Sequence, residues 1–383
     1  MQVHGRRVLV TGGAGLIGSH LVDRLIAEYD CTVRILDNLE PQTHPDGRPD
    51  WIHPDAELVV GDVADRDIVE RALDGVELVW HQAAFGGFTS ELSKYVNANS
   101  TGTALIYEVI RNRGYDVKKV VAASSQAIYG EGQYRCPDHG PFEQHAMRPI
   151  ERLEEGRWEA PCPVCGADSG PMRVPETKRA DCESVYGISK YAEERLVLGL
   201  GRSQGIPSVA LRYAVTYGPR QSIYNPYTGV VSIFSTQLLN GKRPVVYEDG
   251  LQTRDFMYVG DCARANIFVM ESDETAYRAF NVGTGQATTV LDLARKLAGI
   301  YGVDMEPLCR GDFRPWDVRH FVHDPSALEN LGFKTEVSID EGLAQYAAWI
   351  REQGDVREYF TEAERKLRET GVIRSSRAAP ARN

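Results

Sequence analysis

The chain has 383 residues, a formal net charge of −11 at pH 7, 42% hydrophobic residues and 25% charged residues. This length favours about two lobes, and an acidic balance without a long Lys/Arg run argues against nucleic acid and anionic membranes as partners. With no apolar run near the roughly 20 residues of a membrane span, seven cysteines and a first strand too early for a signal peptide, we expect a cytoplasmic protein.

A glycine-rich turn follows the first predicted strand, at residues 8–10. Thr11–Gly18 reads TGGAGLIG and precedes an amphipathic helical pattern. Strand, glycine turn and helix in this order are typical of a dinucleotide-binding fold, in which the helix N-terminus meets a pyrophosphate. Asp37 ends the second strand, 19 residues after Gly18, where an acid holds the adenosine ribose. We predict NAD rather than NADP, because the carboxylate would repel a 2′-phosphate.

The next segments alternate between strands and helices. Strands are predicted at 58–60, 78–84 and 120–123, and helices at 66–74 and 95–113. The strands are almost continuously apolar, which is typical of a parallel sheet covered on both faces. We therefore predict an α/β fold with a Rossmann doubly wound parallel sheet.

Residues 131–182 interrupt this alternation, because they are rich in Pro, Gly, Cys and charge and show no clear period. Cys136 and His139 form one pair, and Cys162 and Cys165 form another, each with two residues between its members. This spacing suits one tetrahedral zinc in a Cys₃His site. We predict an inserted zinc knuckle with a structural metal, against the alternative of a flexible loop with incidental cysteines.

The regular pattern resumes with a helix at 185–201 and a strand at 208–213. Tyr186 and Lys190 lie four apart and share one helix face. A lysine beside a phenol favours the phenolate, so Tyr186 can act as a base. Ser125, at the end of the 120–123 strand, can hold the substrate oxygen. Beyond Tyr217 the elements are shorter, which indicates a smaller C-terminal α/β substrate lobe.

Seven segments between residue 8 and about 335 resemble the extended short-chain dehydrogenase/reductases, specifically the nucleotide-sugar epimerase/dehydratase family. They are TGGAGLIGSH (11–20), SSQAIYG (124–130), YGISK (186–190), LRYAVTYGPRQ (211–221), QTRDFMYV (252–259), FNVGTG (280–285) and RPWDVRH (314–320). The resemblance implies a homodimer formed through the helices near 95–113 and 186–203, which carry Ile106, Val109 and Leu196.

The resemblance also implies a set of site residues. Ser125, Tyr186 and Lys190 would be catalytic. The cofactor would meet Gly12, Gly15, Leu16, Ile17, Gly18, Asp37, Asn38, Asp62, Val63, Ala83, Ala84, Asn99, Tyr186 and Lys190. The substrate would meet Ser125, Gln126, Arg220, Tyr247, Arg254, Arg314 and Asp317.

Domain boundaries follow from the same comparison. The NAD-binding domain spans 1–215, with 255–283 returning to it, and the insertion spans 131–182. The nucleotide-sugar-binding lobe comprises 216–254 and 284–370, and 371–383 is expected to be a mobile tail.

The residues after Ser125 bear on the reaction. Family members that eliminate water or carboxylate carry acidic residues there, whereas this chain has Gln126 and Ala127. Without that acid or base, the expected reaction is 4-epimerisation: oxidation, rotation of the ketone and re-reduction, with NAD tightly bound. An NAD-dependent nucleotide-sugar dehydrogenase or dehydratase is one alternative, and a non-catalytic NAD-sensing scaffold is another.

The substrate is read from resemblance alone. The Cys/His-bearing block and the stretch 225–229 are similar to dTDP-L-rhamnose 4-epimerase-like sequences, which implies dTDP-L-rhamnose or a related NDP-hexose; UDP-glucose and a UDP-uronate stay open. Val215 stands where the family has an Asn that contacts the substrate, and Thr216 and Asn225 are the candidates to replace it.

Overall fold

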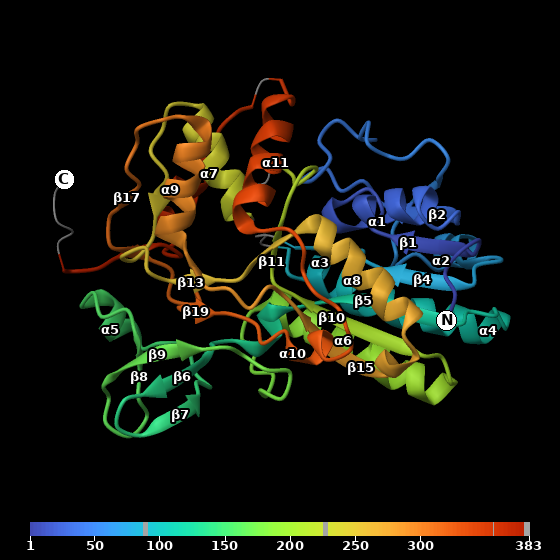
Figure 1. Ribbon diagram of the computed structural model, residues 1–383, viewed down its shortest axis with the longest axis horizontal. Helices are drawn as coiled ribbons and strands as arrows, with labels where there is room; N and C mark the ends of the chain where they lie inside the picture. The colour runs from blue at the N-terminus through green and yellow to red at the C-terminus, as the bar shows by residue number, and fades with distance from the viewer. Residues whose placement is uncertain (87–90, 225–228, 355, 379–383) are drawn as a thin grey trace.

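The computed structural model describes residues 1–86, 91–224, 229–354 and 356–378. A seven-stranded parallel sheet forms the core of the larger unit, on the right of Figure 1. The strand order is β15-β10-β5-β4-β1-β2-β3. The strands are β1 (Arg7–Thr11), β2 (Thr32–Asp37), β3 (Glu57–Val60), β4 (Leu78–His81), β5 (Lys119–Ser125), β10 (Ser208–Tyr213) and β15 (Arg278–Val282). The order reverses between β1 and β4, and the carboxyl ends of the strands at such a point border a ligand crevice.

Helices cover both faces of the sheet, because alternate strand residues point to opposite sides. Val8 and Val10 of β1 join a core with α1 (Leu16–Ala27) and α8 (Val259–Glu271). Leu9 joins the other core, with α2 (Arg66–Leu73), α4 (Gly102–Arg113) and α6 (Val185–Gln204). Segment 255–283 contributes α8 and β15 to this unit, with the short helix η3 (Asp273–Thr275) between them.

The helix expected over 95–113 is not a uniform α-helix. It consists of α3 (Ser93–Tyr95), the π-helical turn η1 (Val96–Thr101) and α4. Such wide turns occur frequently at functional sites. This one contains the buried Asn99.

The second lobe packs three helices around an apolar core. They are α7 (Val230–Leu239), α9 (Val290–Tyr301) and α11 (Ile339–Arg351), and Phe234, Leu297 and Tyr346 lie at their contact. The lobe's strands are β11 (Val215–Tyr217), β12 (Val245–Val246), β13 (Thr253–Arg254), β14 (Phe256–Tyr258), β16 (Thr288–Thr289), β17 (Leu308–Cys309), β18 (Asp312–Phe313) and β19 (His320–Phe321). The short helix α10 (Ser326–Glu329) returns to the edge of the large sheet, beside β15.

The insertion forms its own four-stranded antiparallel sheet, which lies beside β19 in Figure 1. The order β7-β6-β9-β8 joins β6 (Gln133–Cys136), β7 (Gly140–Glu143), β8 (Ala160–Pro161) and β9 (Asp168–Met172), and α5 (Ile150–Glu154) connects β7 to β8. The sequence predicted no regular strands here, because each strand is short and polar.

The chain end differs from the predicted mobile tail over its described part. After α12 (Phe360–Glu369), β20 (Arg374–Ser375) pairs antiparallel with β18, Ile373 is buried, and Arg377 forms an ion pair with Glu154 at 2.5 Å. These contacts dock residues 371–378, whereas 379–383 lie outside the described residues. In the described part of the chain, every helix is too short or too polar to cross a bilayer.

Candidate active site

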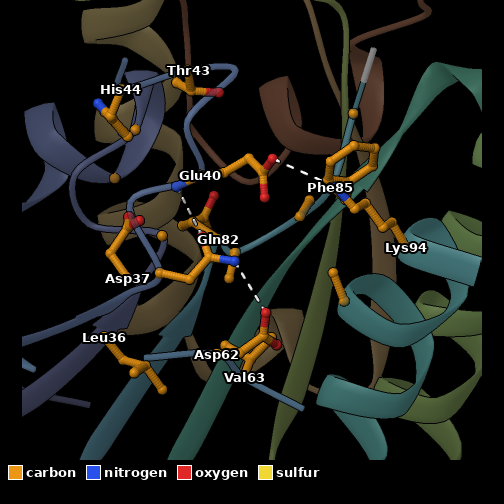
Figure 2. A pocket seen from close by; sticks show the side chains of 18 of the residues that line it. Leu36, Asp37, Glu40, Thr43, His44, Asp62, Val63, Gln82, Phe85 and Lys94 are labelled. Carbon is orange, nitrogen blue, oxygen red and sulfur yellow. Dashed lines mark hydrogen bonds and ion pairs between the residues drawn. The ribbon is translucent and has the colours of Figure 1, made fainter. Parts of the chain in front are cut away.

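A cavity of about 490 Å³ opens at the carboxyl ends of β1, β2 and β4 (Figure 2). It lies at the point where the strand order reverses. Of the residues predicted to bind the cofactor, those that line it are Gly12, Gly15, Leu16, Ile17, Gly18, Asp37, Asn38, Asp62, Val63, Ala83 and Ala84.

The glycine turn is shaped for a ligand at the N-terminus of α1. Gly12 has a φ of 67°, and a Cβ there would lie 2.7 Å from the Ala83 nitrogen. A Cβ at Gly15 would meet only the Gly12 oxygen, at 3.4 Å, so protein packing does not require that glycine. The space therefore serves the cavity. Gly15 also caps α1 without a side-chain hydrogen bond, which leaves N–H groups for an anion.

The acid at the end of β2 is held by backbone groups. The two carboxylate oxygens of Asp37 accept hydrogen bonds from the Ala14 and Leu39 nitrogens, each at 2.9 Å. Asn38 donates to Asp62 at 3.0 Å, so both acids are oriented at the same end of the cavity. Each Asp37 oxygen has capacity to accept a further hydrogen bond, which suits a pair of ribose hydroxyls.

Several cavity residues were missed by the sequence analysis. Figure 2 shows Glu40, Thr43 and His44, from the loop after β2, facing Phe85 and Lys94 across the cavity. Glu40 and Lys94 form an ion pair at 3.8 Å. The loop has no hydrophobic period and Lys94 is far from it in sequence, so no local pattern marks these residues.

The predicted catalytic residues lie on β5 and α6, which pack against each other. Ser125 ends β5, and its hydroxyl oxygen accepts from the Ala127 nitrogen at 3.1 Å, so its own proton stays available. α6 begins at Val185 with Ser184 as its cap, which places Tyr186 in the first turn. A Cβ at Gly86, which lines the cavity, would lie 3.8 Å from the Tyr186 ring. Tyr186 therefore lies beside one residue of the cavity wall, although it is not itself among the lining residues.

Lys190 is buried, and its ammonium is already paired with a carboxylate of the same helix. Its ammonium donates to Glu193 at 2.5 Å, and both side chains are excluded from water. The charge of Lys190 also acts on the neighbouring His81. Burial first, and then Lys190, lower the pKa of His81 to about 3, so the His81 ring is neutral. The sequence analysis did not single out Glu193.

Asn99 does not line the cavity, in contrast to its predicted cofactor contact. Its amide oxygen accepts from the Phe85 nitrogen at 2.8 Å, and its amide nitrogen donates to the Phe85 oxygen and to Ser189 at 3.1 and 2.9 Å. It is fully buried. Asn99 therefore ties the cavity wall to α6 and supports the site from behind.

Four of the predicted substrate residues, Tyr247, Arg254, Arg314 and Asp317, gather at the segment from β18 to β19, residues 312–321, which we call the late arm. Arg314 donates to Asp317 at 2.6 Å and lies over the Tyr247 ring, 5.2 Å from its centroid. Burial opposes ionisation of Asp317, but Arg314 and Arg254 outweigh it and lower its pKa to about 2. Burial raises the pKa of Tyr247 to about 12, so its hydroxyl stays a donor.

Arg254 is placed differently from the prediction that it pairs with a diphosphate. Its two terminal nitrogens donate to the backbone oxygens of Thr253, Val318 and Arg319 and to the Asp317 carboxylate, at 2.6–3.2 Å. These bonds occupy the planar fork that would grip a phosphate. Arg254 therefore holds the late arm in place.

The remaining predicted substrate residues differ in whether their polar groups are already bound within the protein. Arg220 forms an ion pair with Asp23 of α1 at 2.7 Å, which turns it toward the dinucleotide-binding unit. Gln126 follows Ser125, and its buried amide oxygen has no partner among the described residues. The Thr216 hydroxyl lies 3.2 Å from the Cys262 sulfur, inside the protein. Asn225 and the rest of 225–228 lie outside the described residues.

The Cys/His residues of the insertion converge. Cys136 and His139 stand at the β6–β7 turn, and Cys162 and Cys165 stand between β8 and β9. Their four ligand atoms lie within 4.8 Å of one another. Cys136 is 3.8 Å from the Cys165 sulfur and 3.6 Å from the His139 nitrogen, and Cys162 is 3.7 Å from that nitrogen.

These distances fit a tetrahedral metal. Zinc–ligand bonds of about 2.3 Å to sulfur and 2.0–2.1 Å to nitrogen imply edges of about 3.8 and 3.6 Å. Backbone N–H groups, first that of Cys165 and also that of Val164, lower the pKa of the Cys162 thiol to about 6. A thiolate is the form that binds zinc.

A buried polar cluster connects the insertion to the late arm. The Arg148 guanidinium contacts Glu131 at 3.2 Å and Glu248 at 2.8 Å, and it donates to the Asp317 backbone oxygen at 2.9 Å. Arg319 of the late arm, which is fully buried, pairs with Glu159 at 2.6 Å and with Glu248 at 2.8 Å. These buried ion pairs therefore link the insertion directly to the late arm.

Comparison with known proteins gives a consistent picture. Residues 8–152 and 163–283 match the model of the NAD dependent epimerase/dehydratase family. The chain is 37% identical over 360 residues to the dTDP-L-rhamnose 4-epimerase of Burkholderia thailandensis, covering 92% of this chain and 97% of that protein.

Two solved structures have a similar fold. The UDP-glucose 4-epimerase of Thermotoga maritima with UDP-glucose has a TM-score of 0.74 and 31% identity, covering 91% of this chain and 99% of that one. The UDP-glucose 4-epimerase of Thermus thermophilus in complex with NAD has a TM-score of 0.71 and 30% identity, covering 91% of this chain and 100% of that one.

Proposed function

The chain belongs to the NAD-dependent epimerase/dehydratase family, and from this premise we propose that it is an NAD-dependent nucleotide-sugar 4-epimerase. The observation that carries the proposal is that β5, which ends at Ser125, packs against α6, and that α6 places Tyr186 beside Gly86 in the wall of the cavity that also holds the glycine turn and Asp37. The similar epimerases of Burkholderia and Thermotoga support the reaction class.

NAD is the cofactor that the cavity residues fit. The space beside Gly15, the uncapped N-terminus of α1 and the oriented Asp37 suit a pyrophosphate and an adenosine ribose without a 2′-phosphate. Bound NAD⁺ supplies a reversible acceptor for the hydride at the sugar C4. Since epimerisation has no net redox change, we propose that the cofactor stays bound through turnover.

Tyr186 acts as the base in this proposal. It takes the proton from the C4 hydroxyl, while Ser125 donates a hydrogen bond to the same oxygen, and Tyr186 returns the proton after the ketone has rotated. Gln126 and Ala127 follow Ser125 in the short helix η2 (Gln126–Tyr129) and provide no carboxylate there for elimination of water. The protein is therefore an epimerase in this proposal and not a dehydratase.

The late arm is proposed to bind the nucleotide-diphosphate part of the substrate. Arg314 keeps one terminal nitrogen outside its pair with Asp317, and Gln126, next to Ser125, has an amide oxygen without a hydrogen-bond partner among the described residues. By similarity to the Burkholderia enzyme we propose dTDP-L-rhamnose or a related NDP-hexose as the substrate. UDP-glucose and a UDP-uronate are the competing substrates.

The test is incubation with a panel of nucleotide sugars without added cofactor, followed by NMR of the sugar C4 proton. We expect conversion of one C4 epimer into the other. A requirement for added NAD with its net reduction would instead indicate a dehydrogenase, and a 4-keto-6-deoxy product would indicate a dehydratase. Binding of NAD without conversion of any sugar would instead favour a non-catalytic NAD-sensing scaffold.

We also propose that the four Cys/His ligands hold one structural zinc. All four coordination positions are filled by protein, so the metal has no open position for catalysis. X-ray absorption should give about 2.3 Å for each zinc–sulfur bond. Protein purified without chelator that contains no zinc by elemental analysis would defeat this proposal.

The insertion is proposed to shape the sugar pocket. It starts just after η2 and ends just before α6, so it joins the elements that carry Ser125 and Tyr186. Cys162→Ser should disorder the insertion and raise KM, while the NAD-binding unit stays folded. An unchanged KM in this variant, with the metal lost, would contradict the role in the pocket.

A cytoplasmic homodimer completes the proposal. Ile106 and Val109, which were expected at the interface, are buried in the core of the subunit itself. The exposed apolar residues near that face are Leu92, Val96 and Ile188, on or beside α3, η1 and α6, and each is about half exposed. None of the seven cysteines, all within the described residues, forms a disulfide, as expected in a reducing compartment. A monomer by light scattering at micromolar concentration would contradict the dimer.

A further inference from the structure

Glu193 is a buried acidic side chain that the proposed mechanism does not use. It is excluded from water, and its Oε2 accepts from the Lys190 ammonium at 2.5 Å. Its other oxygen, Oε1, has no hydrogen-bond partner among the described residues. Burying a carboxylate with an unpaired oxygen is costly, so this arrangement needs an explanation beyond packing.

The helix aligns Glu193 with the catalytic residues. Tyr186, Lys190 and Glu193 occupy positions i, i+4 and i+7 of α6, which lie on one face of the helix. Lys190 therefore shares a helix face with the phenol of Tyr186 and gives its ammonium to the carboxylate of Glu193. Ionisation of Glu193 weakens the effect of Lys190 on the phenol.

Glu193 can change its charge near neutral pH. Burial is the largest influence on the pKa of Glu193 and raises it. The positive charge of Lys190 lowers this pKa and the negative charge of Glu194 raises it further, so that it lies at about 7. Glu194 is itself paired with Arg212 of β10 at 2.7 Å.

Two further titratable groups face this site from the sheet. Tyr213 of β10 is affected by Glu193, but burial raises its pKa far above neutrality. His81 of β4 is neutral, for the reason given above. Neither of these groups changes its charge near pH 7, so Glu193 is the titrating group of the cluster.

We propose that Glu193 is a positioning residue that holds Lys190 and sets the pH range over which Tyr186 accepts a proton. The inference rests on the proposed role of Tyr186 as the base. While it is ionised, the Glu193 carboxylate neutralises part of the Lys190 charge, which holds back formation of the phenolate. When Glu193 takes up a proton, Lys190 acts on the phenol with its full charge.

The test is a phenolate titration by near-ultraviolet absorbance on the full-length protein saturated with NAD⁺. Subtracting the titration of Tyr186→Phe isolates the signal of Tyr186. In Glu193→Gln we expect the midpoint to fall by about 0.5–1 pH unit, because a nearby charge shifts such an equilibrium by about one unit or more and Lys190 intervenes here. Glu194→Gln is the matched control, since Glu194 binds Arg212 and Ser124 but not Lys190. Because Glu194 reaches the phenol only through its effect on Glu193, the midpoint of this control should move clearly less than that of Glu193→Gln.

The outcomes separate this inference from the proposed function. If the parent protein shows no phenolate signal that depends on Tyr186, the assignment of Tyr186 as the base fails. If that signal is present and Glu193→Gln leaves its midpoint unchanged, the role of Glu193 fails. Should Glu193→Gln not fold, Glu193→Leu is titrated in its place. If neither variant folds while Glu194→Gln does, Glu193 serves the fold alone and the proposal is overturned.

Discussion

Replacing Arg148 by Met tests whether the insertion positions the late arm. In the parent protein the Arg148 guanidinium is buried and contacts Glu131, Glu248 and the backbone oxygens of Trp158 and Asp317. Methionine fills a similar volume but provides neither the charge nor the donors. The substitution therefore removes the electrostatic link and keeps most of the packing.

The structure sets the size of the effect. Glu131 and Glu248 are nearly excluded from water, and they would lose a cation while keeping other partners, Tyr134 and Arg319 respectively. Removing one member of a buried ion pair costs about 3–5 kcal/mol. Because the other partners remain, we expect the free energy of unfolding to fall by about 3 kcal/mol. The lost bond to Asp317 contributes about 1.5–3 kcal/mol to the position of the arm, so KM should rise roughly tenfold or more.

The assay is urea unfolding of the NAD-saturated protein, together with KM for the nucleotide sugar that the panel identifies. Arg157→Met is the control in the same insertion, because Arg157 is half exposed and lies 3.9 Å from Glu155. Its unfolding free energy should change by less than about 1 kcal/mol. If Arg148→Met behaved like Arg157→Met in both measurements, the reasoning about this buried cluster would be wrong.

Three further predictions address the base, the cofactor and the pH dependence of stability. Tyr186→Phe keeps the ring but removes the base, so kcat should fall by several orders of magnitude with NAD still bound; activity within about tenfold of the parent would contradict the assignment. Asp37→Ala should weaken NAD binding and narrow the preference over NADP, as measured by calorimetry, and equal affinity of the parent for both would contradict the role of Asp37. Burial opposes ionisation of Glu159, but His320 and Arg319 lower its pKa to about 2. The stability it contributes is therefore present above the ordinary carboxyl range and lost as pH falls from about 4.5 toward 2, so Glu159→Gln should flatten that part of a thermal-stability profile.

Local patterns determined much of the site. The glycine turn, Asp37, the Tyr186–Lys190 pair and the two Cys/His pairs were all noticed in the sequence. The structure places the glycine turn and Asp37 on one cavity, Tyr186 and Lys190 on one helix, and the four Cys/His ligand atoms within 4.8 Å of one another. They were recognisable because each chemistry depends on a short spacing: a tight turn before a helix, one helical turn between a phenol and an ammonium, or two residues between metal ligands.

The sequence did not predict which charged residues of the second lobe pair with each other, although it identified these residues as candidates. Arg254 and Arg314 look alike as arginines beside a substrate. The terminal nitrogens of Arg254, however, donate to backbone oxygens of the late arm, whereas Arg314 keeps one terminal nitrogen outside its ion pair with Asp317. Which donors remain depends on backbone oxygens more than 60 residues away in the chain. No local spacing encodes that distance.

The sequence by itself therefore determined the fold class and the dinucleotide turn, and it supplied the candidates for the reacting side chains. Only the tertiary structure decided that Glu193 lies against Lys190, that the loop after β2 closes one wall of the cavity and that residues 371–378 dock on the late arm. The physical reason is desolvation: periodicity shows which face of an element is buried, but the energy of a charge depends on which partner is buried with it. That partner is chosen by packing between distant segments.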